Sequence, residues 1–411
     1  MKKSSCYMIL FALSFMLLCG CAGVPFSDVQ QVPQDDVTES VDMPAEEDST
    51  AEGDLGFTVI PATEEEEQET PPVDPVEEKV QALLSEMSLE ERVAQMFFVR
   101  CPESGAVEAL SQYALGGYIL FASNLSGLTE EEVRSLIGGF QENAKIPLLI
   151  GTDEEGGTVV RVSSNPNLRE SKFQSPRDLL GEGGIDLLIS DTREKSQLLL
   201  SLGINVNLAP VCDLSDNPDD FIYDRSMGGD AETVSDYVTQ MVEAMQEEGI
   251  GSVLKHFPGY GNCADTHEGI VIDHRVADDF LVADLLPFEA GAANGAGGVL
   301  VCHNIVEAFD EELPASLSPA VHELLREKLG NDIVVMTDDL DMDGITEYTD
   351  GASAAVQAVV AGNDLLLLSD YETGIRAVLD AVEDGTVTEE RINESVSRIL
   401  TWKIALGLIE A

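Results

Sequence analysis

Residues 252–267 read SVLKHFPGYGNCADTH, in which a short run ends in a Lys-His pair and opens into a loop rich in Gly and Pro. The run is too short for a helix, and the Pro and Gly that follow are typical of the loop after a strand. Comparable runs elsewhere in the chain are apolar at consecutive positions, the pattern of a parallel strand covered on both faces. We therefore predict a buried strand over 252–255, followed by a polar loop.

The same pattern occurs eight times, and helical periodicities lie between the runs. Eight strands that alternate with helices predict an α/β fold, a (β/α)8 barrel of the TIM type. An open, doubly wound sheet is the alternative, and the number of strands favours the barrel. The predicted strands are 94–99, 117–121, 147–151, 205–209, 252–255, 298–301, 333–337 and 365–368, and the helices include 130–143, 175–202, 231–249, 319–329 and 389–406.

Polar side chains follow several of these strands. In a barrel of this type the carboxyl ends of the strands surround the active site, so polar residues there converge on one rim. The residues concerned are Asp153, Asp213, Lys255, His256, His303, Asn304 and Asp338.

The chain is strongly acidic, with 77 Asp and Glu against 22 Lys and Arg and a formal charge of −55 over 411 residues. This charge argues against binding to nucleic acid or to an anionic membrane surface, because both need basic patches. Hydrophobic residues make up 44% of the chain, which is enough to bury a large core.

The first 75 residues have the composition of a targeting signal and a tether. Lys2 and Lys3 precede an apolar run over 7–18 that is too short to span a membrane, and Leu-Cys-Gly-Cys follows at 18–21. This order indicates a bacterial lipoprotein signal peptide over 1–20 with lipid attached to Cys21; a secretory signal with incidental cysteines is the alternative. Residues 21–75 contain no Lys or Arg, so we expect a disordered acidic linker. The folded domain then spans 76–411, outside the cytoplasm on a lipid anchor.

The predicted domain retains four of the seven cysteines. No CxxC pair or zinc-type spacing occurs, so we expect no metal and no other cofactor. Four thiols allow three pairings, and free thiols are also compatible with the sequence. The four residues are Cys101, Cys212, Cys263 and Cys302.

The loop after the fifth strand carries an Asp-x-His pair, Asp265 and His267. An aspartate beside a histidine can orient the imidazole and stabilise its charged form. Histidine titrates near neutral pH, so it can donate and then accept a proton in one catalytic cycle. The alternative is a loop histidine with an incidental neighbour.

An acidic pair, Asp338 and Asp339, follows the seventh strand. A carboxylate at this position can attack an electrophilic sugar carbon and form a covalent glycosyl intermediate. The alternative is a helix cap, in which one of the two accepts hydrogen bonds from the amides of the next helix.

Two further stretches supply charged side chains. Asp153 follows the third strand and can accept sugar hydroxyls, and Arg161 can bind a carboxylate or polar groups of a substrate. Arg225 is one of few basic residues in an acidic chain, which favours a specific role for it. The alternatives are a solvated acidic turn around 153–155 and a structural ion pair for Arg225.

Taken together, these stretches resemble glycoside hydrolase family 3, in particular its single-domain β-N-acetylglucosaminidases. The resemblance extends over nearly all of 76–411, and the KHFPG motif followed by Asp-x-His is specific to this branch. The motifs that carry it are GGYILFASN (116–124), GTDEEGGTVVR (151–161), LGINVNLAPVCDL (202–214), DRSMGGD (224–230), LKHFPGYG (254–261), DTH (265–267), TDDLDMDGI (337–345), AGNDLLLLSD (361–370) and RILTWKIALGLI (398–409).

The resemblance implies a role for each matching residue. Asp338 corresponds to the nucleophile, His267 to the acid/base and Asp265 to its partner. The implied reaction is retaining hydrolysis of a terminal β-linked N-acetylglucosamine, derived from peptidoglycan or chitin, without a metal. Substrate-binding positions correspond to Asp153, Arg161, Arg225, Lys255 and His256.

The sequence departs from the family pattern at two positions. The family usually has His where this chain has Tyr260, and often Arg or Lys in place of Thr158. We expect altered loop packing or subsite preference from the first change and fewer contacts near the substrate from the second.

Four other functions remain alternatives. A phosphorylase would use phosphate instead of water on the same site, since a histidine does not repel an anionic acceptor. A metal-dependent hydrolase lacks an HExxH motif. A non-catalytic sugar-binding lipoprotein is opposed by the intact Asp338 and His267. A glucosidase or xylosidase is disfavoured, since such relatives generally carry a second domain.

Overall fold

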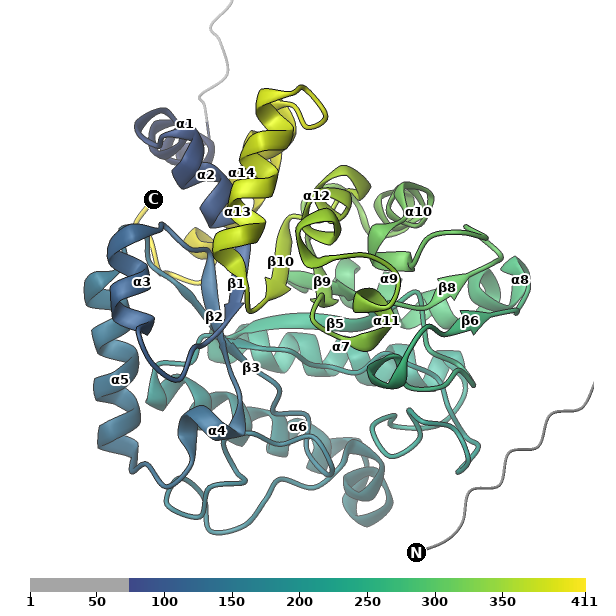
Figure 1. Ribbon diagram of the computed structural model, residues 1–411. Helices are drawn as coiled ribbons and strands as arrows, with labels where there is room; N and C mark the ends of the chain where they lie inside the picture. Colours follow the sequence, from purple (N-terminus) through teal and green to yellow (C-terminus); the bar gives the residue numbers. More distant parts are fainter. Residues whose placement is uncertain (1–73) are drawn as a thin grey trace, which may run out of the picture. The chain divides into compact units, whose positions relative to one another are not determined.

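Eight parallel strands close into a barrel in the computed structural model, which describes residues 74–411 (Figure 1). Each strand pairs with the next along the chain, and the first pairs with the last, Phe97 opposite Leu366. The barrel strands are β1 (Phe97–Arg100), β2 (Gly117–Leu120), β3 (Leu149–Thr152), β4 (Val206–Asn207), β5 (Gly251–Phe257), β7 (Gly298–Val301), β9 (Val334–Asp339) and β10 (Leu365–Leu368).

The barrel prediction is confirmed, although six of the eight strands have shifted boundaries, and three of these shifts matter most. Helix α2 (Leu89–Gln95) takes the start of the first predicted strand, because Ser88 and Glu91 form a capping box that begins a helix there. β5 and β9 extend further than predicted, so His256 and Asp338 lie within strands and not beyond them, and Lys255 lies inside β5 and not at its end. Regular pairing is interrupted at both places, between Leu254 and Phe257 in β5 and between Met336 and Asp339 in β9.

Helices surround the strands, and the five helices predicted from periodicity occur at the expected places. Ser, Thr or Asp side chains accept amide hydrogen bonds at the starts of these helices, as N-caps do. They are α5 (Glu130–Asn143), α6 (Pro176–Leu202), α7 (Ala231–Glu248), α10 (Pro319–Leu329) and α14 (Glu389–Ala405).

The amino-terminal end of the barrel is packed by α14. Trp402 lies against Gly251 and Gly297, and a Cβ atom at Gly297 would come 2.0 Å from its indole nitrogen. Gly297 directly precedes β7 and Gly251 begins β5, so the indole covers the end of the barrel where the strands start. The opposite end of the barrel, where the strands end, is not covered by this indole.

A second, two-stranded sheet was not predicted. β6 (Ile272–Asp273) and β8 (Ile305–Val306) pair in parallel and join the loop after β5 to the loop after β7 (Figure 1). Strands of two residues are too short to give a periodic signal in the sequence.

The predicted signal peptide over 1–20, Cys21 and nearly all of the predicted linker over 21–75 lie outside the described residues. The first described helix, α1 (Pro75–Glu86), begins within one residue of the predicted domain start. Within 74–411, no helix combines the length and the apolar character needed to cross a bilayer.

Lys403 of α14 is fully buried, and its ammonium group has one partner among the described residues, Gln95 Oε1 at 2.8 Å. Gln95 in turn donates to the carbonyls of Ala114 and Leu115, just before β2. Burial lowers the pKa of Lys403 to about 7.

This pKa predicts a pH-dependent stability. An unfolded lysine titrates near 10.4, so between about pH 7 and pH 10 the unfolded chain binds a proton that the folded chain does not. The free energy of unfolding should therefore rise with pH in this window, by up to about 1.4 kcal/mol per pH unit from this group. Urea unfolding of Lys403→Met should show a flatter pH dependence, whereas the exposed control Lys172→Met should follow the wild type. Equal slopes for Lys403→Met and wild type would contradict the assignment.

Candidate active site

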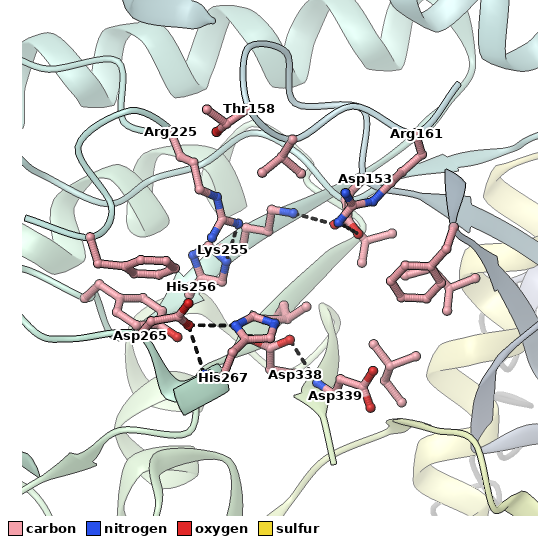
Figure 2. A pocket seen from close by; sticks show the side chains of 18 of the residues that line it. Asp153, Thr158, Arg161, Arg225, Lys255, His256, Asp265, His267, Asp338 and Asp339 are labelled. Carbon is pink, nitrogen blue, oxygen red and sulfur yellow. Dashed lines mark hydrogen bonds and ion pairs between the residues drawn. The ribbon is translucent and has the colours of Figure 1, made fainter. Parts of the chain in front are cut away.

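One cavity of about 390 Å³ opens among the carboxyl ends of the strands and the loops that follow them (Figure 2). This volume is in the range of small-molecule sites. All eight predicted site residues line it: Asp153, Arg161, Arg225, Lys255, His256, Asp265, His267 and Asp338.

Asp338 lies near the end of β9 with its carboxylate at the cavity, and its Oδ1 accepts a hydrogen bond from the Asp339 amide at 2.8 Å. Burial alone would raise the pKa of Asp338, but the nearby imidazoles of His303, His256 and His267 outweigh it and lower that pKa. The carboxylate is therefore ionised at neutral pH, as a nucleophile must be.

The helix-cap interpretation of the acidic pair does not hold. The next helix, α11 (Asp343–Thr346), begins after Met342, which makes no side-chain cap. Asp339 instead accepts from the amide of Asp341 at 3.0 Å and forms an ion pair with Arg100.

Asp265 and His267 form a hydrogen-bonded pair on the loop after β5. Asp265 Oδ1 accepts from both the backbone amide of His267, at 2.9 Å, and its Nδ1, at 2.7 Å. Because Nδ1 is held by the carboxylate, proton exchange with a ligand falls to Nε2. The His267 side chain is 61% exposed, so it reaches the cavity from a surface loop, whereas Asp338 sits on a strand.

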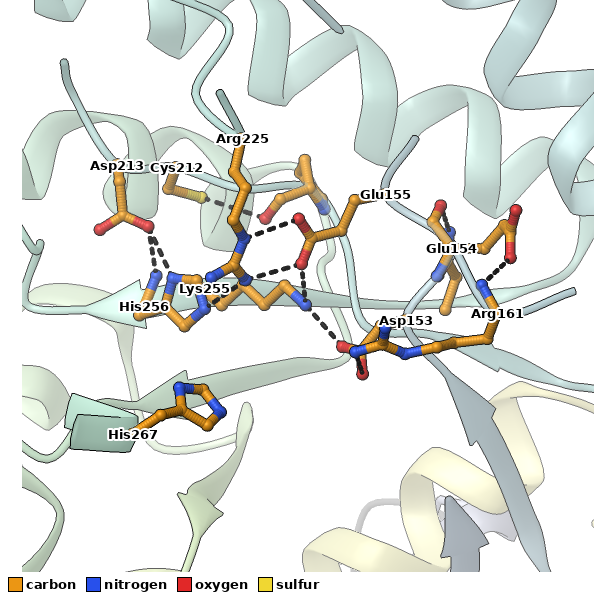
Figure 3. Close-up of polar contacts among 12 residues, drawn as sticks. Asp153, Glu154, Glu155, Arg161, Cys212, Asp213, Arg225, Lys255, His256 and His267 are labelled. Carbon is orange, nitrogen blue, oxygen red and sulfur yellow. Dashed lines mark hydrogen bonds and ion pairs between the residues drawn. The ribbon is translucent and has the colours of Figure 1, made fainter. Parts of the chain in front are cut away.

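A buried ion cluster forms the opposite side of the cavity (Figure 3). Lys255 Nζ lies 2.7 Å from Asp153 and 2.6 Å from Glu155, and Arg225 binds Glu155 through two nitrogens at 2.8 and 3.0 Å. Burial would raise the pKa of Glu155, but Arg225 and Lys255 reverse this and keep the carboxylate ionised. The structural ion pair considered for Arg225 thus exists, and Arg225 also lines the cavity.

The acidic turn at 153–155 is not solvated, because Glu154 and Glu155 are both buried. Glu154 accepts hydrogen bonds from the amides of Arg161, Val162 and Ser163 and so fixes the backbone that carries Arg161. The Arg161 guanidinium lies 3.7 Å from Asp153 at the cavity.

His256 lines the cavity, but its ring nitrogens are occupied by protein groups. Nδ1 lies 2.7 Å from Asp213 Oδ2, so it is the donor, and Nε2 faces Arg225 Nη2 at 2.9 Å and accepts from it. This imidazole therefore links Asp213 to Arg225 and orients the guanidinium.

Three residues predicted at the rim do not line the cavity. Asp213, His303 and Asn304 are buried. The His303 ring is held between Ser316 Oγ at 2.7 Å and the Asp339 carbonyl at 2.9 Å. Position after a strand did not distinguish residues that face the cavity from those that turn away from it.

Residues 88–402 match the glycosyl hydrolase family 3 N terminal domain. The chain belongs to this family. It is 30% identical over 330 residues to beta-hexosaminidase LpqI of Mycobacterium tuberculosis, covering 77% of this chain and 83% of that one. It is 31% identical over 310 residues to a beta-hexosaminidase of Idiomarina loihiensis, covering 73% and 90% of the two chains.

Solved structures of family 3 members agree with this fold. The structure of M. tuberculosis LpqI has a TM-score of 0.72 at 28% identity, with 79% of this chain and 96% of that chain covered. A family 3 β-N-acetylglucosaminidase from Paenibacillus has a TM-score of 0.73 at 33% identity, with 78% and 63% covered. As a family 3 member with such relatives, the chain is a glycosidase.

Sequence reasoning missed two residues that line the cavity beside Asp339, namely Arg100 and Phe121. Arg100, the last residue of β1, lies 3.0 Å from Asp339 and 4.5 Å from the centre of the Phe121 ring, and all three line the cavity. Burial raises the pKa of Asp339 to about 7. The sequence offered a signal for Arg100, because it is a charged residue directly after an apolar run.

None of the four cysteines of the domain lines this cavity. Cys101, Cys212, Cys263 and Cys302 are all buried and free. Burial raises the pKa of the Cys101 thiol to about 12, which makes it inert near neutral pH. Over residues 74–411, no three His, Cys, Asp or Glu side chains cluster in the manner of a metal site.

Glu155 should be required to keep the two cations in place. Glu155→Gln leaves Arg225 and Lys255 buried with too little negative charge, so the free energy of unfolding should fall by about 3–5 kcal/mol. Chemical denaturation measures this. The exposed control Glu170→Gln should change it by less than about 0.5 kcal/mol. A Glu155→Gln protein as stable as the wild type would mean that the cluster is not held by this carboxylate.

Proposed function

We propose that the chain is a retaining exo-glycosidase that removes terminal β-linked N-acetylglucosamine, with Asp338 as nucleophile and His267 as acid/base. The observation that carries the proposal is the single cavity shared by the strand-borne carboxylate and the loop-borne Asp265–His267 pair. The names of relatives at 30% and 31% identity, both beta-hexosaminidases, support this sugar class.

In the first step a carboxylate oxygen of Asp338 forms a bond to the anomeric carbon as the glycosidic bond breaks. The leaving oxygen takes the proton from His267 Nε2, and Asp265 stabilises the imidazolium before transfer. In the second step His267 takes a proton from water, whose oxygen replaces Asp338 at the same carbon. Two displacements on one carbon retain the β configuration.

The remaining cavity residues suit a terminal sugar. Asp153, Arg161 and Lys255 lie across the cavity from His267 and present charged acceptors and donors to sugar hydroxyls (Figures 2 and 3). Charge-assisted hydrogen bonds to hydroxyls are directional, which favours one orientation of the ring. Arg225 acts from behind this group, fixed by Glu155 and His256.

Replacement of Asp338 by Ala should lower kcat by ~10³-fold or more on a small β-linked N-acetylglucosaminide, because no covalent intermediate can form. Proton NMR of the wild-type reaction should show the β anomer released first, at the same rate with and without phosphate. The matched control Asp332→Ala, an exposed aspartate, should keep full activity. Initial release of the α anomer would refute the double displacement, and a product that appears only with phosphate would identify a phosphorylase.

We also propose that the domain lies outside the cytoplasm and is held at the membrane by lipid on Cys21. The support is the order of Lys2-Lys3, apolar run and Leu-Cys-Gly-Cys in the sequence. In a bacterial host, wild-type protein should fractionate with membranes and incorporate labelled fatty acid. Cys21→Ser should lose the label, while Cys19→Ser should keep it. Label on the Cys21→Ser protein would exclude this anchor.

A further inference from the structure

We propose that Tyr260 is a positioning residue for proton transfer, and that its hydroxyl acts through Thr266 to hold the Asp265–His267 pair in place. The inference rests on the proposed role of His267. Tyr260 also lines the cavity, whereas Thr266 does not, and neither residue belongs to the Asp265–His267 pair.

The contact is a buried bond between two hydroxyl groups. Tyr260 Oη lies 2.6 Å from Thr266 Oγ1, and both residues are within 1% of complete burial. Thr266 stands between Asp265 and His267 in a single turn of 3-10 helix, Thr266–Glu268. A shift of Thr266 therefore moves both members of the pair.

The side chains of the pair are themselves partly exposed. Asp265 and His267 have side chains 24% and 61% exposed. In residues 261–272, the buried members are Cys263 and Thr266. Of these two, Thr266 is adjacent to both catalytic side chains.

Tyr260 is itself fixed to the rigid end of β5. Its amide donates to Asp213 Oδ1 at 2.7 Å, and Asp213 also holds His256. Its ring packs edge-on against His256, with 5.1 Å between ring centres, and against Phe221 at 5.6 Å. Tyr260 thus connects the exposed turn that carries Asp265 and His267 to His256 of β5 and to Asp213.

The other face of the turn rests on the segment after the nucleophile. A Cβ atom on Gly344 of α11 would come 3.0 Å from the Thr266 carbonyl oxygen, so the turn packs directly on the helix that follows β9. The turn is thus held by the Tyr260–Thr266 hydrogen bond and by packing on α11. Loss of either contact would shift His267 relative to Asp338, and a misplacement of about 1 Å can cost about 100-fold in rate.

Burial also holds the pKa of Tyr260 well above its usual range, so its hydroxyl stays protonated while His267 exchanges protons. The Tyr260–Thr266 hydrogen bond therefore persists over the pH range in which His267 titrates.

The test removes one hydroxyl at a time. Tyr260→Phe and Thr266→Val each delete one partner with little change of shape, and Thr266→Ser retains the hydroxyl. Tyr118→Phe is the matched control, a buried tyrosine whose hydroxyl bonds the Ala106 carbonyl at 2.8 Å and which does not line the cavity. Each protein is assayed on N,N′-diacetylchitobiose, whose leaving sugar needs a proton, and on a dinitrophenyl N-acetylglucosaminide, whose leaving group does not.

We expect Tyr260→Phe and Thr266→Val to lower kcat/KM on the disaccharide by about tenfold or more, and to change it by less than about twofold on the dinitrophenyl substrate. Thr266→Ser and Tyr118→Phe should behave as the wild type on both. The double variant Tyr260→Phe/Thr266→Val should be no slower than the slower single variant, because both remove the same bond.

Equal losses on the two substrates would show general damage to the site and overturn the proposal. Unchanged activity on the disaccharide, or losses that multiply in the double variant, would do the same. If the wild type cleaves neither substrate, the proposed function fails, and hydrogen exchange decides the positioning role separately. Faster exchange of 261–270 in Tyr260→Phe than in Tyr118→Phe would then support the tether, and equal exchange would overturn it.

Discussion

The closure of the barrel between β1 and β10 is the constraint on which the site depends. When Phe97–Val99 pair with Leu366–Leu368, all eight carboxyl ends are forced onto one rim. Residues as distant in sequence as Arg100 and Asp339 then come within 3.0 Å of each other. An open sheet with the same strands would leave β1 and β10 as separate edges, and this contact would not form.

Buried charge is the second organising feature of the rim. Glu155 pairs with both Lys255 and Arg225, and Asp153 also pairs with Lys255. Asp213 accepts hydrogen bonds from His256 and from the Tyr260 amide. A buried ionic group is tolerated only when its partners are in place, so each member fixes the others. The result is a face of charged groups carried by β5 and by the loops after β3 and β4.

The two proposed catalytic side chains are carried by different kinds of backbone, Asp338 by a strand and His267 by an exposed turn. Asp338 belongs to a strand whose backbone is held on both sides by β7 and β10. His267 belongs to an exposed turn after β5, which is tied down by Tyr260, by α11 and by the small β6–β8 sheet. In the proposed mechanism Asp338, as nucleophile, needs a fixed position, whereas His267, as acid/base, must meet first a leaving group and then water.

The sequence by itself determined the class of fold and most of the residues at the site. Eight apolar runs with helical patterns between them reported the barrel, because burial on both faces leaves a local signature in each strand. The motifs around 153, 255, 265 and 338 indicated which side chains reach the cavity.

Only the tertiary structure decided which of these side chains contact one another. Glu155 bridging two cations, Arg100 beside Asp339, and Tyr260 beneath the Asp265–His267 pair are contacts set by packing and by which way each side chain turns at the rim. The contacts of Glu155 and Arg100 join residues far apart in the chain, so no short stretch of sequence encodes them. Tyr260 and Thr266 are only six residues apart, but the fold of the loop between them decides that they meet.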